Sequence, residues 1–249
     1  MTKKQRPIVA FDLETTGLDK TKDYIIEISA VKFDPKTMVI IGEYSKYVQP
    51  EGAYSISIQA YMKHHITPEF LKDKPYFFEI ADEIIEFIGD CDILTYNGSS
   101  FDIPFLQAEL GRCGRHIDFL NKQCWDACLE ERRRNGNTLE QTYKRYAGKT
   151  MEEAGLSAHE ALSDVKATIF VFNEQQNKEP YGPEAMYGED NFIVNSECNG
   201  QMQPCFNVGK YKNLPISYVS TIDQGYLNWI VEKGEFAQST KNYVKQYIK

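Results

Sequence analysis

Apolar and polar positions follow two patterns along the first 176 residues. Short apolar runs over 7–14, 25–33, 39–48 and 92–96 predict strands, and the first three are expected to form an antiparallel start to a sheet. Apolar residues three or four positions apart predict helices over 80–88, 103–110, 125–134, 139–146 and 158–175. Gly111 is expected to end the second of these helices. Strands and helices that alternate in this way predict an α/β domain.

The pattern changes between residues 177 and 204. Prolines and glycines interrupt this stretch and acidic residues predominate in it, so we expect a linker with little regular structure apart from a short strand near 192–194. Residues 205–249 resume a folded pattern, with a strand or turn over 206–211 and helices over 226–232 and 239–248. The expected organisation is therefore a domain over 1–176, a linker over 177–204 and a small module over 205–249.

The composition is that of an ordinary globular protein. The chain has 249 residues, of which 42% are hydrophobic and 26% charged, which is enough for a sizeable core. No run of about 18 apolar residues is present, so no membrane span is expected. The first residues lack an apolar stretch of signal-peptide length, which leads us to expect a cytoplasmic protein.

Six cysteines in a chain of this length do not indicate a disulfide framework. Two pairs, Cys124 with Cys128 and Cys198 with Cys205, offer four thiolates that could in principle hold zinc. Neither pair has the CxxC spacing of zinc sites, so reduced structural cysteines are favoured.

The net charge of −8 is unevenly distributed. Residues 201–249 carry six lysines against Asp223, Glu232 and Glu235, which is +3, so the first 200 residues carry −11. An acidic domain is compatible with a phosphodiester substrate if metal ions neutralise its carboxylates. Charge alone does not decide the partner.

Asp12 and Glu14 lie two residues apart on an otherwise apolar strand. The two-residue period of a strand places both side chains on one face. Two carboxylates on one face repel each other and are costly to desolvate, so they favour a hard cation between them. Taken alone, the pair is equally compatible with a hydrated strand end.

Three further residues extend this acidic set. Asp102 begins a helix after the strand over 92–96, where a carboxylate also favours the helix dipole. Asp164 lies one turn into a late helix, and His159 lies on the preceding loop if that helix begins near Glu160; otherwise His159 is a surface cap residue. Four converging carboxylates predict a two-metal site for in-line phosphoryl displacement, with an imidazole available to accept a proton from the attacking water.

Three motifs carry a resemblance to a known family. The segment Phe11-Asp12-Leu13-Glu14-Thr15-Thr16-Gly17-Leu18 is similar to the first motif of the DnaQ-like, or DEDDh, exonuclease superfamily. The second motif is matched by residues 96–102, although Tyr96 stands where the family often has His, and the third by residues 159–168, including the His-x4-Asp spacing. The likeness covers residues 6–176, and within the superfamily the chain resembles DNA polymerase III epsilon subunits and exonuclease X-like proteins.

The resemblance implies a fold, a chemistry and a set of roles. The fold would be an RNase H-like mixed five-stranded sheet flanked by helices, with a small C-terminal α+β module. Two Mg²⁺ or Mn²⁺ ions would be held by Asp12, Glu14, Asp102 and Asp164, with His159 as general base. The activity would be metal-dependent 3′→5′ hydrolysis of DNA to nucleoside 5′-monophosphates, in DNA repair or proofreading.

The resemblance also implies contacts with the substrate. Thr15, Thr16 and Leu18 match positions that contact the terminal nucleotide, and Phe101 would lie near the 3′-terminal base or serve a purely structural purpose. His64 begins His64-His65-Ile66-Thr67, which is similar to the family's His-Gly-Ile-Thr loop except that His65 replaces glycine.

The C-terminal segment raises a question of its own. Residues 208–216 and 226–230 resemble the module that follows the nuclease domain in exonuclease X-like proteins. In one interpretation, the lysines of this segment contact phosphates, and rings such as Tyr211 and Trp229 stack on bases. In the other, the aromatic residues simply form the core of a small module. Residues 201–206 weakly resemble a sliding-clamp peptide without its apolar anchor, so a plain linker is favoured over a clamp contact.

The expected partner is single-stranded or 3′-end DNA, with a polymerase or clamp as a further candidate. Two other functions stay open. An exoribonuclease of the same fold is one, because no reader of the 2′-hydroxyl is visible in the sequence. A non-catalytic nucleic-acid-binding adaptor is the other, although an adaptor has no need of four carboxylates and a base.

Overall fold

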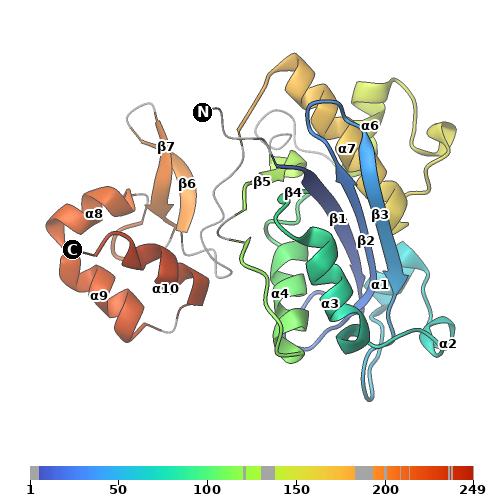
Figure 1. Ribbon diagram of the computed structural model, residues 1–249, viewed down its shortest axis with the longest axis horizontal. Coiled ribbons are helices and arrows are strands. Elements are labelled where there is room, and N and C mark those ends of the chain that lie inside the picture. The colour runs from blue at the N-terminus through green and yellow to red at the C-terminus, as the bar shows by residue number, and fades with distance from the viewer. Residues whose placement is uncertain are drawn as a thin grey trace. The chain divides into compact units, whose positions relative to one another are not determined.

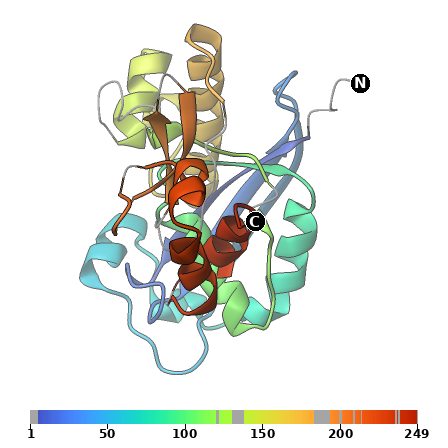
Figure 2. The same ribbon diagram turned by 90° about the vertical axis from the view of Figure 1, so that its left-hand side faces the viewer.

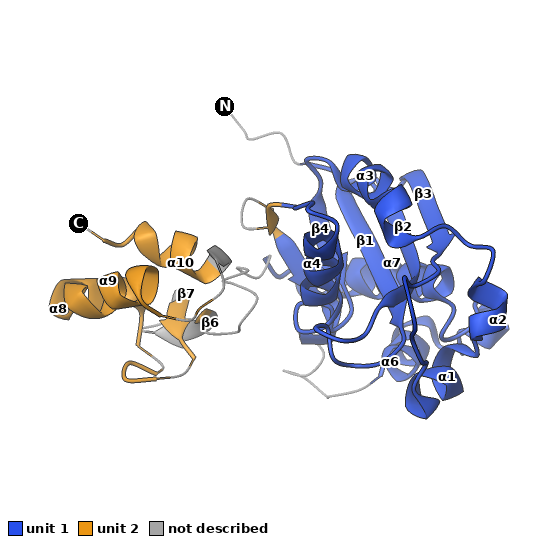
Figure 3. Cartoon of the chain, turned by 90° about the horizontal axis from the view of Figure 1, so that it is seen from below, with its two compact units in different colours: residues 1–117, 124–182 blue, residues 118–123, 183–249 orange. Residues whose placement is uncertain are grey.

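The structure is a computed structural model, shown in Figure 1. It describes residues 6–119, 122–129, 138–182, 193–198, 201–207, 209–212, 214–234, 236 and 238–248. The chain divides into two compact units (Figure 3): residues 1–117 with 124–182, and residues 118–123 with 183–249. None of the helices in these described ranges combines the length and apolarity that a membrane crossing requires.

The first unit is built on a mixed five-stranded sheet. Its strands are β1 (Ile8–Thr15), β2 (Ile25–Phe33), β3 (Ile40–Tyr47), β4 (Asp92–Thr95) and β5 (Cys124–Asp126), in the order β3-β2-β1-β4-β5. β1 pairs antiparallel with β2, and β2 with β3, while β4 runs parallel to β1 and β5 parallel to β4. The predicted antiparallel start is confirmed.

Helices cover both faces of this sheet (Figures 1 and 2). The long helix α7 (Ala161–Lys178) packs on β1 and β2, and α6 (Leu139–Ala147) packs on α7. On the opposite face lie α3 (Phe77–Ile88) and α4 (Asp102–Arg112). Shorter elements complete the unit, namely α1 (Ile58–His64), α2 (Pro68–Leu71) and the 3₁₀ turn η2 (Glu152–Ala154).

The alternation of side chains along β1 and β2 decides which helix each residue meets. Ile8 and Ala10 share a buried cluster with residues of α7, and the ring of Phe33 lies 6.4 Å from that of Phe172. The opposite face is marked by Lys32, whose Nζ lies 4.8 Å from the ring centre of Phe87 on α3. Each large side chain buried in this way contributes roughly 1.5–3 kcal/mol. The even-numbered residues of β1 therefore face α7.

Two predictions for this unit are corrected, and two short helices were not predicted. The expected helix over 125–134 is wrong at residues 125 and 126, because 124–126 form strand β5 by pairing with β4. Residues 127–129 are helical, and residues 130–134 lie outside the described part of the chain. The helix expected to end at Gly111 continues to Arg112. The short helices α1 and α2 were not predicted, although Ser57 and Thr67 each cap one of them by accepting a backbone N–H.

In its described residues, the second unit contains a hairpin and three helices. Strands β6 (Ile193–Cys198) and β7 (Gln201–Phe206) pair antiparallel, and α8 (Ile216–Ile222), α9 (Gln224–Glu232) and α10 (Gln238–Lys245) follow. The short strand expected near 192–194 corresponds to the start of β6. The expectation of little regular structure in the rest of 177–204 is wrong for the other residues of this hairpin, and α7 extends to Lys178. Residues 183–192 lie outside the described part. The sliding-clamp resemblance over 201–206 falls on β7, where Phe206 is completely buried.

Candidate active site

Strand β1 places the two predicted carboxylates on the face that meets α7. Asp12 and Glu14 continue the row of Ile8 and Ala10, which is buried against that helix. Both acids are partly buried where β1 nears its end. Partial burial of both acids disfavours the alternative of a fully hydrated strand end.

The loop between β4 and α4 brings Asp102 to the same place. Asp102 is only 4% exposed, and its Oδ1 accepts the backbone N–H of Leu13 at 3.0 Å. Gly98 makes this approach feasible, because a Cβ there would lie 2.8 Å from Asp102 Oδ2 and 2.6 Å from Thr95 Cβ. Asp102 is thus tied directly to the strand that carries the first two acids.

Asp126 holds the loop between β4 and α4 through hydrogen bonds, a role that the sequence did not reveal. It is 2% exposed at the end of β5. Its Oδ1 accepts the N–H of Asn97 at 2.7 Å and that of Cys128 at 3.1 Å, while its Oδ2 accepts the N–H and hydroxyl of Ser99 at 3.1 and 2.6 Å. Asn97 adopts a left-handed backbone with φ of 67°, a conformation that asparagine tolerates better than most residues. Asp126 therefore holds the turn that leads into Asp102.

Helix α7 supplies the fourth acid, and the turn before it supplies the imidazole. The helix begins at Ala161 with Glu160 as N-cap, so His159 lies on the preceding loop. The backbone of His159 is left-handed, with φ of 62°, and its N–H donates to Asp164 Oδ2 at 3.2 Å. Its Nε2 lies 3.4 Å from Glu140 Oε1 on α6. The loop position of His159 is the arrangement required for it to reach the acids.

One cavity of about 240 Å³ gathers all five residues. Its lining includes Asp12, Glu14, Asp102, His159 and Asp164. One ligand atom each from Glu14, His159 and Asp164 lie within 4.8 Å of one another. The structure thus brings together residues that are up to 152 positions apart in the sequence, from Asp12 to Asp164.

Burial and mutual repulsion raise the pKa values of these carboxyls. Burial first, and then the charges of Asp102, Asp164 and Glu14, raise the pKa of Asp12 well above its ordinary range. Burial is also the main reason why the pKa rises to about 8 for Glu14 and to about 7 for Asp102 and Asp164. Acids in this state are stabilised by a cation among them, because a cation compensates both burial and repulsion.

A further acid behind the site was missed at the sequence level. Glu27 lies directly opposite Glu14 in the β1–β2 register and is 3% exposed. Burial, together with the charges of Glu160 and Asp164, raises the pKa of Glu27 to about 7. The signal in the sequence was a glutamate inside the apolar run Ile25–Phe33, which is unusual for a buried strand.

The donor set fits a divalent metal ion. Carboxylate oxygens are the ligands that Mg²⁺ prefers, and Mn²⁺ also accepts imidazole nitrogen. Asp12, Glu14, Asp102 and Asp164 supply oxygens around one cavity. His159 is close enough to Glu14 and Asp164 to serve either as a base or as a ligand. In the described part of the chain, no cysteine belongs to a grouping of three or more such ligands.

The predicted substrate-contact residues divide into two groups. Thr15, Leu18 and Phe101 line the cavity, and Leu18 is 80% exposed at its edge. Thr16 and His64 do not line it. The hydroxyl of Thr16 donates to Asp23 at 2.9 Å, and the carbonyl of Thr16 accepts the N–H of Ser57. Nδ1 of the buried His64 accepts the N–H of Ile66 at 2.9 Å, so these two residues hold loops rather than face the cavity.

Helix α1 contributes lining residues that sequence reasoning did not find. Ser57, Gln59, Ala60 and Lys63 all face the cavity. The charge of Lys63 is close enough to lower the pKa of Glu14 in part. The N-cap serine followed by a basic last turn, Lys63-His64, was a signal for this helix that could have been used.

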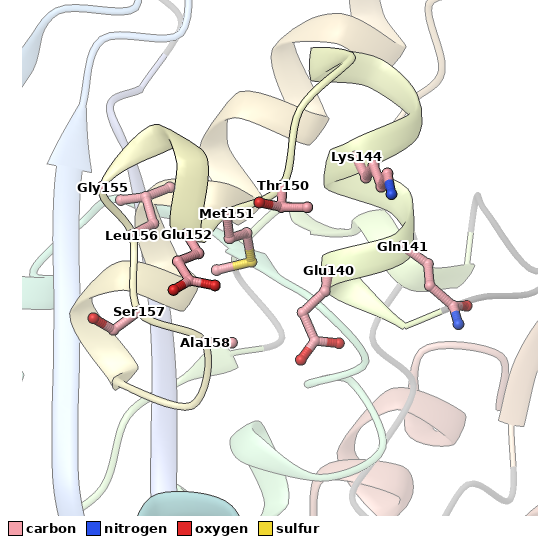
Figure 4. Close-up of a pocket in the computed structure, with 10 residues that line it drawn as sticks. All are labelled: Glu140, Gln141, Lys144, Thr150, Met151, Glu152, Gly155, Leu156, Ser157 and Ala158. Atoms are coloured by element: carbon pink, nitrogen blue, oxygen red, sulfur yellow. The ribbon is translucent and has the colours of Figure 1, made fainter.

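A larger cavity of about 620 Å³ lies beside the His159 loop. Figure 4 shows Glu140, Gln141 and Lys144 of α6 on one side and residues of the segment 150–158 on the other. Its lining is mixed in charge and lacks the gathered acids of the smaller cavity. Glu140 links the two, because its carboxylate contacts both this space and His159.

Comparison with known proteins identifies a family match and several relatives. The model of the RNase_T family, described as exonuclease, matches residues 9–172. DNA polymerase III subunit epsilon of Rickettsia conorii is 42% identical over 104 residues, which cover 41% of this chain and 43% of that protein. The subunit of the same name from Treponema pallidum is 41% identical over 104 residues, covering 42% and 46%. The chain thus spans less than half the length of these curated relatives.

A solved structure supports the architecture. Exonuclease I of E. coli, in complex with a dT13 oligonucleotide, superposes with a TM-score of 0.59 over 71% of this chain and 42% of that chain, at 22% identity. At this identity the likeness concerns the fold. The predicted mixed five-stranded sheet flanked by helices is confirmed.

Proposed function

The chain belongs to the exonuclease family, whose model spans residues 9–172, and on this basis we propose that it is a metal-dependent 3′→5′ exonuclease that hydrolyses DNA to nucleoside 5′-monophosphates. The resemblance to DnaQ-like exonucleases is confirmed by the family match and by the curated relatives. The observation that carries the proposal is the convergence of Asp12, Glu14, Asp102, Asp164 and His159 on one cavity. A non-catalytic adaptor would gain nothing from such a costly cluster.

The four carboxylates would hold two Mg²⁺ or Mn²⁺ ions. When bound, such ions neutralise the acids, lower the pKa of a water molecule and stabilise a leaving oxygen. Asp102 is fixed to the backbone of Leu13 and Asp164 to that of His159, so both are oriented before any ion enters. This preorganisation reduces the cost of binding.

His159 is the proposed general base. A ring nitrogen lies within 4.8 Å of carboxylate oxygens of Glu14 and Asp164, where it can accept a proton from the attacking water. Glu140 lies 3.4 Å from Nε2 and so can hold the imidazole in this orientation. The loop position leaves His159 partly exposed, with a side-chain exposure of 45%, which leaves a route for the proton to solvent.

The residues around the acids are suited to binding the end of a nucleic-acid strand. Lys63 supplies a positive charge for a phosphate, and the exposed Leu18 can separate the terminal base from its neighbour. Phe101 lines the cavity and packs on Phe105, with ring centres 5.0 Å apart. An aromatic ring held in this way offers a surface against which a base can stack.

DNA is the substrate class that we favour, because the curated relatives are named DNA polymerase III subunit epsilon. The same names support a role in proofreading or repair with a polymerase as partner. The buried position of Phe206 does not favour a clamp contact through residues 201–206.

The experiment is a side-by-side digestion of DNA and RNA oligonucleotides of one sequence, labelled at the 5′ end, with the full chain in Mg²⁺, in Mn²⁺ and in EDTA. We expect metal-dependent shortening of the DNA from its 3′ end with release of nucleoside 5′-monophosphates. Equal or faster digestion of RNA would replace DNA by RNA as the substrate.

Two substitutions test the assignment of roles. Asp12→Ala should abolish turnover, whereas Asp90→Ala, at an exposed acid in the same unit, should not change it. His159→Ala should slow turnover by roughly 10²–10⁴-fold and leave the thermal stabilisation by Mn²⁺ intact. Full activity of Asp12→Ala would refute the site, and loss of the Mn²⁺ effect in His159→Ala would make His159 a ligand.

A further inference from the structure

The core of the second unit consists mainly of aliphatic side chains. The buried residues are Ile193, Phe206, Ile216, Val219, Leu227, Ile230 and Val244, among which Phe206 is the one aromatic residue in this cluster. Trp229 does not belong to it and is 46% exposed. The explanation that the aromatic residues of this segment serve only as core therefore does not account for Trp229.

Tyr211, Tyr226 and Phe236 are partly buried and pack against this core, and they form a row of rings with the exposed Trp229. Tyr211 and Tyr226 meet edge to face with centres 5.0 Å apart, and Tyr226 stacks on Trp229 at 5.8 Å with planes 23° apart. Phe236 contacts the far side of this row, 5.7 Å from Trp229. Tyr226 and Trp229 are three positions apart on α9 and so share one helix face.

Asp223 fixes one end of the row. It caps α9 by accepting the N–H of Tyr226 at 3.0 Å, and it accepts the hydroxyl of Tyr211 at 2.7 Å. It also binds Nζ of Lys210 at 3.0 Å, which places that ammonium group 4.8 Å from the centre of the Tyr211 ring. The row is thus held in place before a ligand binds, which lowers the entropic cost of binding.

Positive charges flank the row. Lys212 follows Tyr211 directly, and Lys233 lies four residues after Trp229, where its N–H donates to the Trp229 carbonyl. Both lysines are exposed, and neither has an ion pair among the described residues. The segment 205–249 carries six lysines against three acidic residues. Flat rings beside cations suit a ligand that offers both flat bases and phosphates.

We propose that the row Tyr211–Tyr226–Trp229, flanked by Lys210, Lys212 and Lys233, is a second binding site for single-stranded nucleic acid, separate from the cavity that holds the acids. The proposal rests on the proposed function in one respect, namely that the strand bound is the one to be hydrolysed. Two sites on one chain raise the effective concentration of a long strand at the catalytic site without new chemistry. A short oligonucleotide would gain nothing from the second site.

Binding is tested with the full chain in EDTA, where hydrolysis is prevented. Fluorescein-labelled dT30 and rU30 are titrated by anisotropy at several salt concentrations, and tryptophan emission is followed in parallel. The chain has two tryptophans, and Trp125 is only 7% exposed, so quenching by the strand should come from Trp229. The quenching should persist in Trp125→Phe.

Variants separate stacking from charge. Trp229→Ala should weaken binding of dT30 by roughly ten-fold, whereas Tyr218→Ala, at an exposed ring of α8, should not change it. Because Trp229→Ala could disturb folding, the pair Lys212→Glu and Lys233→Glu provides a second measurement with the rings intact. This double variant should lower the slope of log affinity against log salt by about 1.4.

A wild-type affinity and salt slope in both variants would overturn the proposal and would point to a protein partner for this row. Release of nucleotide from a trinucleotide in Mg²⁺ should be the same for the wild type and Trp229→Ala. If the wild type releases nothing from any substrate, the proposed catalytic function fails, and the binding result is judged separately. Equal losses for dT30 and rU30 would identify a site that does not distinguish the two sugars.

Discussion

Substitution of Glu14 by Gln should stabilise the metal-free protein while it destroys the activity. Burial and neighbouring acids raise the pKa of Glu14 from 4.5 to about 8. Between pH 4.5 and about pH 8, the carboxyl of Glu14 is therefore protonated in the folded state and ionised in the unfolded state. Folding takes up the proton, so the contribution of Glu14 to stability is most favourable below about pH 4.5 and falls until about pH 8.

The magnitude follows from the size of this shift. Each pKa unit corresponds to about 1.4 kcal/mol, so at about pH 8.5 the ionised Glu14 costs the folded state on the order of 4 kcal/mol. At about pH 5 the cost is below ~1 kcal/mol. Because glutamine has the same shape and no charge, Glu14→Gln should raise the Tm of the metal-free protein by roughly 10 °C at the higher pH. The gain should nearly vanish at the lower pH.

The assay is thermal unfolding followed by circular dichroism in EDTA at both pH values. Glu86→Gln, at an exposed acid on α3, is the matched control and should leave the Tm unchanged. Addition of Mn²⁺ should raise the Tm of the wild type, and more so at high pH, but should raise that of Glu14→Gln much less. A lower Tm for Glu14→Gln at high pH in EDTA would refute the reasoning, because it would mean that the buried charge is already compensated by the protein.

Two further substitutions address residues that position the site. Glu140→Gln removes the charge that lies 3.4 Å from His159 Nε2, so kcat should fall on the order of ten-fold with KM unchanged. Steady-state kinetics measures this effect, with Glu152→Gln as the control because Glu152 lines the same larger cavity (Figure 4). A change confined to KM would contradict the prediction. Asp126→Ala leaves the buried N–H groups of Asn97 and Cys128 without their acceptor and should lower the free energy of unfolding by about 3 kcal/mol. Urea denaturation measures this loss, and an unchanged midpoint would show that Asp126 does not hold the loop before Asp102.

Local patterns in the sequence were sufficient for much of the first unit. Residues 25–33 are a continuous apolar run apart from Glu27, Ser29 and Lys32, and they form β2 with the predicted bounds. The acids of the three motifs were found because charged residues next to apolar runs are conspicuous without knowledge of their neighbours. The predicted helix over 125–134 is wrong at residues 125 and 126, which pair with β4, whereas residues 127–129 are helical. Local spacing does not reveal such pairing between distant segments.

By itself the sequence determined where the apolar runs lie, which acids interrupt them and which family they resemble, because these properties depend on residues close together in the chain. Only the tertiary structure decided that Glu27 lies opposite Glu14, that Asp126 holds the loop before Asp102 and that Glu140 contacts His159. It also decided that Trp229 lies outside an aliphatic core. The physical reason is that strand register, burial and side-chain pairing join distant segments, and periodicity reports which face is buried but not which residue it meets.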